Sequence, residues 1–284
     1  MVSPASLLLL AATLLAHSFA TPPPVDVLPT DPRLLFNGRW FHDTAAAVPS
    51  ATTDWPCASL RFGVAFRAQR NASQPTPIVE IVWSNLRDRV NATVRCEATG
   101  RIVHSALFEG PAVFSKLTTW PLTFPAVVAS GNYTIELRKL TTAAPFGMGI
   151  GSKVLSPSTI DFRGLRVTGA GAATLIRRAP GRARRLEFVG ASDTAGYCVD
   201  GAPGMSPIVW GAFGWKYENC GMGYPSLVAA AFDADLSVEA VSGIGVTQNA
   251  AAKSQWQVGL LSAWLCAEPV HVSMPVSAPV SLCS

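Results

Sequence analysis

An apolar strand pattern that ends in a turn of small residues constrains the fold of this chain more than any other feature. The stretch 185–201 reads R-L-E-F-V-G-A-S-D-T-A-G-Y-C-V-D-G, and its residues 186–189 suit a buried strand. Gly190 and Ala191 then permit a sharp turn that leaves Ser192 at the carboxyl end of that strand. Open α/β sheets place their ligand sites at this edge. The pattern therefore predicts an α/β sheet with a serine hydroxyl that a substrate can reach.

The residues after this turn continue in the order helix and strand. A helix is expected at about Tyr224–Phe232, because Pro225 suits its first turn and three consecutive alanines favour helix. Leu236–Val241 reads as a second strand, followed by Ser-Gly-Ile-Gly. Strand, helix and strand make the unit of a parallel sheet. We therefore expect a partial α/β domain over residues 183–250, shorter than the roughly 100–150 residues of a typical domain.

The part of the chain before this block has the pattern of an antiparallel β-sandwich. Leu60, Phe62 and Val64 alternate with residues that suit an outer face, and turn signals separate several such segments. An antiparallel sandwich is the natural packing for strands of this kind, and we expect a jelly roll over residues 31–172. Strands are expected at residues 60–66, 78–83, 90–96, 102–108, 134–138 and 159–167.

The serine block resembles the first block of the SGNH (GDSL-type) hydrolases. In detail it is similar to F-I-G-D-S-I-T-x-G-Y-G of the family 2 carbohydrate esterases, which remove acetyl groups from plant cell-wall polysaccharides. The aspartate of that motif is Ala191 here, and its last glycine is Cys198. The residues at matching positions are Phe188, Gly190, Ser192, Thr194, Gly196 and Tyr197.

The resemblance extends upstream and covers roughly residues 35–249. Asn37–Trp40 is similar to the opening G-R motif of the esterases, and residues 132–139 are similar to their late H-x-V-x-L-x-K strand. The resemblance implies a fold of two domains, an N-terminal all-β jelly roll followed by a flavodoxin-like SGNH hydrolase domain. Here the hydrolase domain is expected to be partial and truncated, with a divergent tail at residues 251–284.

The resemblance also implies roles for individual residues. Ser192 would be the nucleophile, and the backbone N–H of Gly243 would stabilise the oxyanion. The late asparagine and histidine blocks of the family have no convincing match. Glu268-Pro269-Val270-His271 places an acid three residues before a histidine, so His271 is the candidate for the base in the tail. The aromatic residues that could stack on sugar rings are Trp210, Trp215 and Tyr217, although buried core aromatics are the commoner interpretation.

Two functional hypotheses remain open at this point. The first is a secreted O-acetyl esterase that deacetylates polysaccharides or oligosaccharides such as xylan or glucomannan by serine acyl transfer, without a metal or other cofactor. The missing asparagine and histidine blocks leave open that this chain is inactive. The second is a non-catalytic glycan-binding or interaction module with a vestigial hydrolase fragment. Binding of a polysaccharide without turnover would favour the second hypothesis.

The N-terminus and the sequons indicate an extracellular protein. Residues 1–20 have an apolar core and end in Ser-Phe-Ala, a pattern that signal peptidase cleaves, and no later segment reaches the roughly 20 apolar residues of a membrane span. Three glycosylation sequons begin at Asn71, Asn91 and Asn132. Six cysteines also fit an oxidising compartment. By location alone, the pairs Cys57–Cys96 and Cys198–Cys220 are suggested among the 15 connectivities that six cysteines allow.

Charge gives no indication of a nucleic-acid partner. The formal net charge is only +4, and the basic cluster at residues 177–185 surrounds Ala-Pro-Gly. No aromatic residues that could stack on bases interleave with these arginines. A solvated linker between two domains is therefore the preferred interpretation, with no membrane and no nucleic acid among the expected partners.

Overall fold

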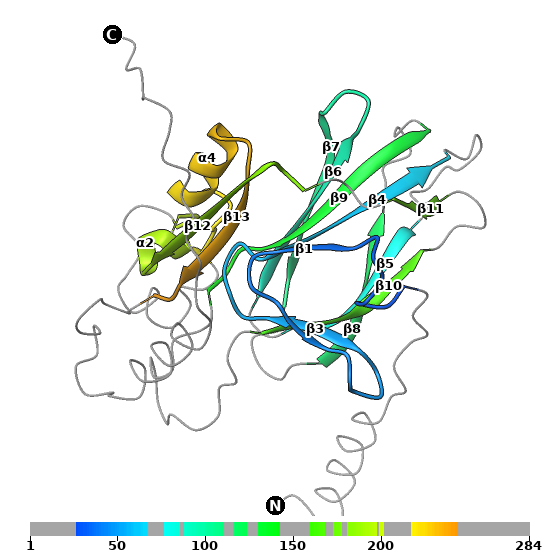
Figure 1. Ribbon diagram of the computed structural model, residues 1–284, viewed down its shortest axis with the longest axis horizontal. Coiled ribbons are helices and arrows are strands. Elements are labelled where there is room, and N and C mark those ends of the chain that lie inside the picture. Colours follow the sequence, from blue (N-terminus) through cyan, green and yellow to red (C-terminus); the bar gives the residue numbers. More distant parts are fainter. Residues whose placement is uncertain are drawn as a thin grey trace, which may run out of the picture. The chain divides into compact units, whose positions relative to one another are not determined.

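The described part of the chain consists mainly of β-strands, with few helices (Figure 1). The structure is a computed structural model. It describes residues 27–67, 77–85, 88–110, 116–123, 130–142, 159–167, 173–177, 181–197, 199–201 and 217–242. Within these residues, no helix is long and apolar enough to cross a membrane.

Within the described residues, eleven strands form two antiparallel sheets. The first sheet has the order β1-β4-β9-β6-β7, with β11 paired to β4, and the second has the order β2-β3-β10-β5-β8. The first comprises β1 (Leu35–Asn37), β4 (Ser59–Phe66), β6 (Arg89–Cys96), β7 (Ile102–Glu109), β9 (Gly131–Lys139) and β11 (Ala173–Ile176). The second comprises β2 (Phe41–Asp43), β3 (Ser50–Thr53), β5 (Pro77–Asn85), β8 (Lys116–Thr123) and β10 (Ile160–Val167). Each of the six strands expected from the alternation pattern is therefore present.

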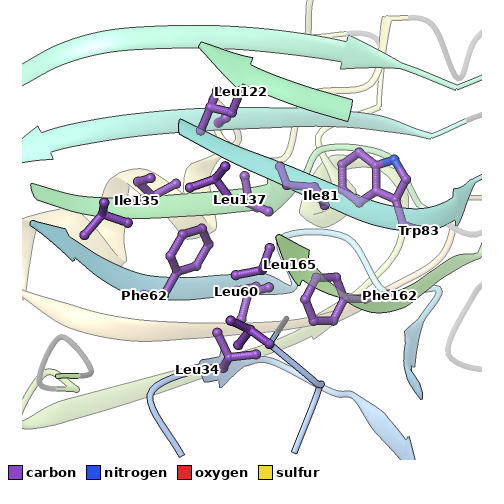
Figure 2. Close-up of a cluster of buried hydrophobic side chains, with 14 of the residues drawn as sticks. Leu34, Leu60, Phe62, Ile81, Trp83, Leu122, Ile135, Leu137, Phe162 and Leu165 are labelled. Atoms are coloured by element: carbon purple, nitrogen blue, oxygen red, sulfur yellow. The ribbon is translucent and has the colours of Figure 1, made fainter. Parts of the chain in front are cut away.

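One hydrophobic core lies between these two sheets. It contains Leu60 and Phe62 of β4 as well as Ile81 and Trp83 of β5 and Phe162 of β10, all of them almost completely buried. Figure 2 shows these side chains together with those of β8 and β9 in one cluster. Burial of a large apolar side chain contributes about 1.5–3 kcal/mol, so this cluster supplies much of the folding free energy.

Strand β4 departs from the predicted pattern on its outer face. The alternation predicted that residues between the core positions would face solvent, yet Arg61 and Gly63 are also buried. Arg61 forms an ion pair with Asp235, and a Cβ at position 63 would lie 2.9 Å from Ile176 Cγ1. The second face of β4 is therefore covered by later segments of the chain, which period-2 patterning cannot indicate.

Strand β8 was not among the predicted strands, and its sequence contains Pro121. A proline has no backbone N–H, so a central strand would lose one of its ladder hydrogen bonds at that position. In the structure β8 is the last strand of its sheet and pairs only with β5 among the described strands. An edge strand tolerates proline, so the residue is compatible with this position.

The described residues of the α/β part form two parallel strands and two helices. Strand β12 (Arg184–Gly190) pairs with β13 (Ala234–Ala240), and the helices are α2 (Ser192–Ala195) and α4 (Tyr224–Ala231) (Figure 1). Helix α4 has a proline at its first turn, as expected. The predicted second strand is confirmed, but it begins two residues earlier, at Ala234.

The two faces of strand β13 differ in chemistry. Leu236, Val238 and Ala240 join Ala195 of α2 and Ala229 of α4 in a second apolar cluster. The alternate residues Asp235 and Glu239 are also buried. Asp235 forms an ion pair with Arg61, and Glu239 forms one with Arg39. One face of β13 therefore packs on the helices, and the other is held by charged groups.

Candidate functional site

The turn from β12 into α2 requires glycine at two positions. A Cβ at Gly190 would lie 2.0 Å from Thr194 Oγ1, because the first turn of α2 folds back over the strand end. Gly196 ends α2 with a φ of +75°, and a Cβ there would lie 2.5 Å from the carbonyl oxygen of Asn219. Any other residue would strain this backbone or force it apart. The glycines therefore maintain a sharp elbow with Ser192 at its tip.

Ser192 is the first residue of α2 and is half-buried. Its backbone carbonyl accepts a hydrogen bond of 2.9 Å from the N–H of Tyr197. Its hydroxyl forms no hydrogen bond with any residue that the structure describes. The residue before it, Ala191, occupies the N-cap position and has no side chain that could cap the helix. The aspartate of the resembling motif would have supplied a carboxylate here.

The carboxyl ends of β12 and β13 lie at the same edge of the sheet. The strands are parallel, and Gly190 pairs in register with Ala240. Ser192 and Ser242 therefore each follow two residues beyond the same pair. Ser242 is buried and directly precedes Gly243 in the sequence. The register thus brings the Ser192 elbow and the start of the Ser-Gly-Ile-Gly segment to one edge, as expected for an open α/β sheet.

Several predicted site residues fall outside the described part of the chain. The geometry of the site is therefore defined without their positions. They are Asn71, Cys198, Trp210, Trp215, Gly243 and His271.

Tyr217 lies on a segment that runs beside the residues after α2. Its carbonyl oxygen accepts a hydrogen bond of 2.9 Å from the N–H of Asp200, and the N–H of Asn219 donates one of 2.9 Å to Gly196. The Asn219 side-chain amide also donates to Asp200. Tyr217 itself is half-buried. The backbone around this aromatic residue is therefore tied to the end of the helix that carries Ser192.

Charged pairs join the sandwich strands to the α/β part, and sequence reasoning did not find them. Arg61 pairs with Asp235, Arg39 pairs with Glu239, and Arg89 Nη1 lies 2.9 Å from Asp200 Oδ2. The pair members are separated by 174, 200 and 111 positions in the sequence. Such long-range pairs leave no local pattern, since each arginine by itself looks like an ordinary surface residue.

Two buried carboxyl groups of the described α/β part, those of Glu239 and Glu218, have a raised pKa. Burial raises the pKa of Glu239 to about 7, and a hydrogen bond with Glu187 raises it further against the opposing effect of Arg39. Burial also raises the pKa of Glu218 to about 8. Glu218 accepts a hydrogen bond of 2.7 Å from the N–H of Thr142. At neutral pH the Glu218 carboxyl is therefore mostly protonated and neutral.

A disulfide joins Cys57 to Cys220, with Cα atoms 5.6 Å apart. Both predicted pairings are therefore wrong: Cys96 is a free thiol, and Cys220 is already bonded. Both partners of the disulfide are buried. The bond connects the segment before β4 to the segment before α4, across 163 positions of sequence.

The register of the first sheet explains why Cys57 cannot reach Cys96. The N–H of Cys57 donates to the carbonyl of Lys139 at one end of β9, whereas Cys96 pairs with Tyr133 near the other end. Six residues of strand span about 20 Å. A disulfide requires Cα atoms less than about 7 Å apart.

Other predicted surface features lie on the sandwich. Asn132 is exposed on β9, and Asn91 is half-buried on β6, where Ser105 donates a hydrogen bond of 3.0 Å to its side chain. The two described histidines, His42 on β2 and His104 on β7, are also on sandwich strands. In the described residues, no group of three or more His, Cys, Asp or Glu side chains could hold a metal ion.

The comparisons with known proteins agree with the resemblance of the serine block. No family model and no curated protein matches the chain. A family two carbohydrate esterase from Cellvibrio japonicus matches in structure with a TM-score of 0.57 and 18% identity, over 78% of this chain and 54% of that one. One from Clostridium thermocellum, in complex with cellohexaose, matches with a TM-score of 0.54 and 20% identity, over 76% and 53%.

An acetyl xylan esterase (Est2A) from Butyrivibrio proteoclasticus has a TM-score of 0.54 and 14% identity, over 80% of this chain and 51% of that enzyme. The chain thus spans about half the length of the esterases that it matches. The resemblance predicted from the sequence is confirmed at the level of the fold. Over its aligned part, this chain has the fold of the family 2 carbohydrate esterases.

Proposed function

We propose that this chain is a secreted carbohydrate O-acetyl esterase in which Ser192 is the nucleophile. The Ser192 hydroxyl attacks the carbonyl carbon of an acetyl group, the sugar oxygen leaves with a proton, and water then releases acetate from the acyl-serine. The backbone N–H of Gly243 stabilises the oxyanion, a contribution of about 3 kcal/mol for a single donor in known enzymes. The substrate class is an acetylated polysaccharide or oligosaccharide.

The geometry of the Ser192 elbow is the observation that carries this proposal. The serine follows a strand, lies at the tip of a turn that requires glycine on both sides, and has a hydroxyl without a hydrogen bond to the described residues. The adjacent parallel strand ends at the same edge. The fold of the matching esterases supports the same reaction class, and one of them is an acetyl xylan esterase.

The domain arrangement is part of the proposal. A jelly roll at residues 31–172 binds and presents the polysaccharide, and an SGNH-type domain at residues 183–250 performs the chemistry. Tyr217, together with Trp210 and Trp215, stacks on sugar rings. The two antiparallel sheets and the parallel pair β12 and β13 support this division.

The decisive experiment is acetate release by the secreted protein from p-nitrophenyl acetate and from acetylated xylan. The Ser192→Ala variant should lose the activity, whereas Ser237→Ala, a half-buried serine on β13, should retain it. His271→Ala tests the only base candidate of the tail. Equal acetate release by the wild type and Ser192→Ala would refute the proposed role of Ser192.

The alternative hypothesis predicts a different pattern. A non-catalytic glycan-binding module would retain acetylated xylan equally well with serine or alanine at position 192, and neither protein would release acetate. Affinity electrophoresis in gels that contain the polysaccharide measures this retention directly.

A further inference from the structure

Two buried polar residues, Thr142 and Glu218, converge on the carboxyl end of strand β13. We propose that they are positioning residues, which hold the turn after β13 in place and thereby aim the oxyanion donor that follows it. The inference about the turn depends only on the structure. Its consequence for catalysis rests on the function proposed above.

One hydrogen bond joins these two residues to each other, and two connect them to the strand end. The N–H of Thr142 donates to Glu218 Oε2 at 2.7 Å, and its hydroxyl donates to the carbonyl oxygen of Ala240 at 3.0 Å. Glu218 Oε1 lies 3.5 Å from Ser242 Oγ. Thr142 and Glu218 therefore contact the chain at the last residue of β13 and again two residues later.

All four residues are shielded from water. Thr142 and Glu218 are 1% exposed, Ala240 is fully buried, and Ser242 is 7% exposed. Loss of a buried hydrogen-bond partner leaves a polar group desolvated and unpaired, at a cost of about 1–3 kcal/mol. Water cannot replace these contacts without opening the junction, so they restrain the turn more strongly than surface contacts would.

The end of β13 needs such support, because its sheet offers little. Among the described strands, β13 pairs only with β12, and the register ends at Ala240. Beyond that pair, the side chain of Ser242 contacts Glu218. Thr142 follows β9 of the sandwich, and Glu218 precedes α4, so the turn is fixed from two separate parts of the chain.

The surroundings of Glu218 favour a neutral carboxyl as the connecting group. Burial raises its pKa, the nearby carboxylate of Asp88 raises it further, and Lys139 opposes this effect. Lys139 is itself paired with Asp88 at 2.6 Å, and both are fully buried. The Thr142 N–H and the Ser242 hydroxyl both donate to carboxyl oxygens of Glu218, and these two hydrogen bonds lower its pKa without offsetting the larger effect of burial.

Hydrogen exchange of the turn tests the structural inference whether or not the chain is an active enzyme. In Thr142→Val the hydroxyl is lost from a side chain of the same shape, and amides of residues 240–242 should exchange at least tenfold faster than in the wild type. Thr142→Ser keeps the hydroxyl and should remain within twofold. Glu218→Ala should also accelerate exchange, whereas Glu218→Gln, which retains an acceptor and a donor, should not.

Two controls separate this effect from general unfolding. Amides of the core strand β4 should keep wild-type exchange in each variant that is analysed. Glu80→Gln alters the ion pair with Arg166 between β5 and β10 of the second sheet, so it should leave exchange at residues 240–242 unchanged. If Glu218→Ala does not fold, Thr142→Val and Ser242→Ala test the same inference. Wild-type exchange at the turn in Thr142→Val and Ser242→Ala would overturn it.

The kinetic arm tests the catalytic consequence. If the wild type releases acetate, Thr142→Val should lower kcat about tenfold with KM within twofold, because an oxyanion donor acts mainly in the transition state. Thr142→Ser should restore kcat. An unchanged kcat in Thr142→Val would refute the catalytic consequence alone. Absence of activity in the wild type would refute the proposed function but would leave the exchange result decisive for the positioning role.

Discussion

Replacement of Glu218 by glutamine should stabilise this protein, and by more as the pH rises. The pKa of Glu218 is raised from 4.5 to about 8 by its burial. Between these two values the folded state holds a proton that the unfolded state has released. Folding stability therefore falls as the pH rises through this window. Glutamine is neutral at every pH and retains the geometry of a protonated carboxyl, so Glu218→Gln removes this cost.

The size of the effect follows from the same pKa. One pKa unit corresponds to about 1.4 kcal/mol, so the variant should gain roughly 5 kcal/mol in free energy of unfolding well above pH 8. The gain should be about 3 kcal/mol at pH 7 and less than about 1 kcal/mol at pH 5. Water that enters the site when the Glu218 carboxyl ionises would reduce this gain at high pH. The value of roughly 5 kcal/mol is therefore an upper limit.

Urea denaturation followed by tryptophan fluorescence at pH 5, 7 and 9 measures these differences. Glu97→Gln is the matched control, because Glu97 is exposed and the same substitution there should change stability by less than about 0.5 kcal/mol. Because the pKa of Glu239 is also raised, to about 7, the stability of the Glu218→Gln variant should still fall as the pH rises toward 7, but less steeply than that of the wild type. A stability difference between Glu218→Gln and wild type that is the same at pH 5 and pH 9 would refute the reasoning.

Three further predictions concern the elbow and the disulfide. Gly190→Ala should cost about 3 kcal/mol, because its Cβ would overlap Thr194, and thermal unfolding would show a clear fall in Tm. Ala191→Asp should add about 1 kcal/mol by capping α2, and urea denaturation at pH 7 that shows no gain would contradict the capping argument. Replacement of Cys57 and Cys220 together by alanine should lower the free energy of unfolding by about 5 kcal/mol relative to the oxidised wild type, on the chain-entropy estimate for a sequence separation of 163 residues. A loss below about 1 kcal/mol would be inconsistent with this estimate.

Local patterns in the sequence were enough to predict most strands and the site elbow. Alternation along Leu60–Phe66 requires only that side chains of a strand point to opposite faces, and the core of the sandwich confirms it. Gly190 could be recognised as part of a turn because small residues follow the strand directly. Strand β8 was missed. Its Pro121 is compatible with an edge strand and equally with a loop, and the sequence does not distinguish the two.

The functional roles could be predicted only in part. Ser192 was identified from its neighbours in sequence, and the structure places it at the shared edge of two parallel strands. Thr142 and Glu218 were not identified, because a threonine after a strand and a glutamate in a loop carry no local signal. Their significance comes from three hydrogen bonds among residues that are 24 to 98 positions apart.

The sequence by itself determined the positions of most strands along the chain, the elbow around Ser192 and the likeness to an esterase. These depend on neighbouring residues, whose side-chain size and backbone freedom act over a few positions. Only the tertiary structure decided that Cys57 bonds to Cys220, that Arg61 is buried against Asp235, and that Glu218 contacts Ser242 beyond the end of β13. Such contacts form after distant segments have packed together, when burial changes both the partners and the pKa of a side chain.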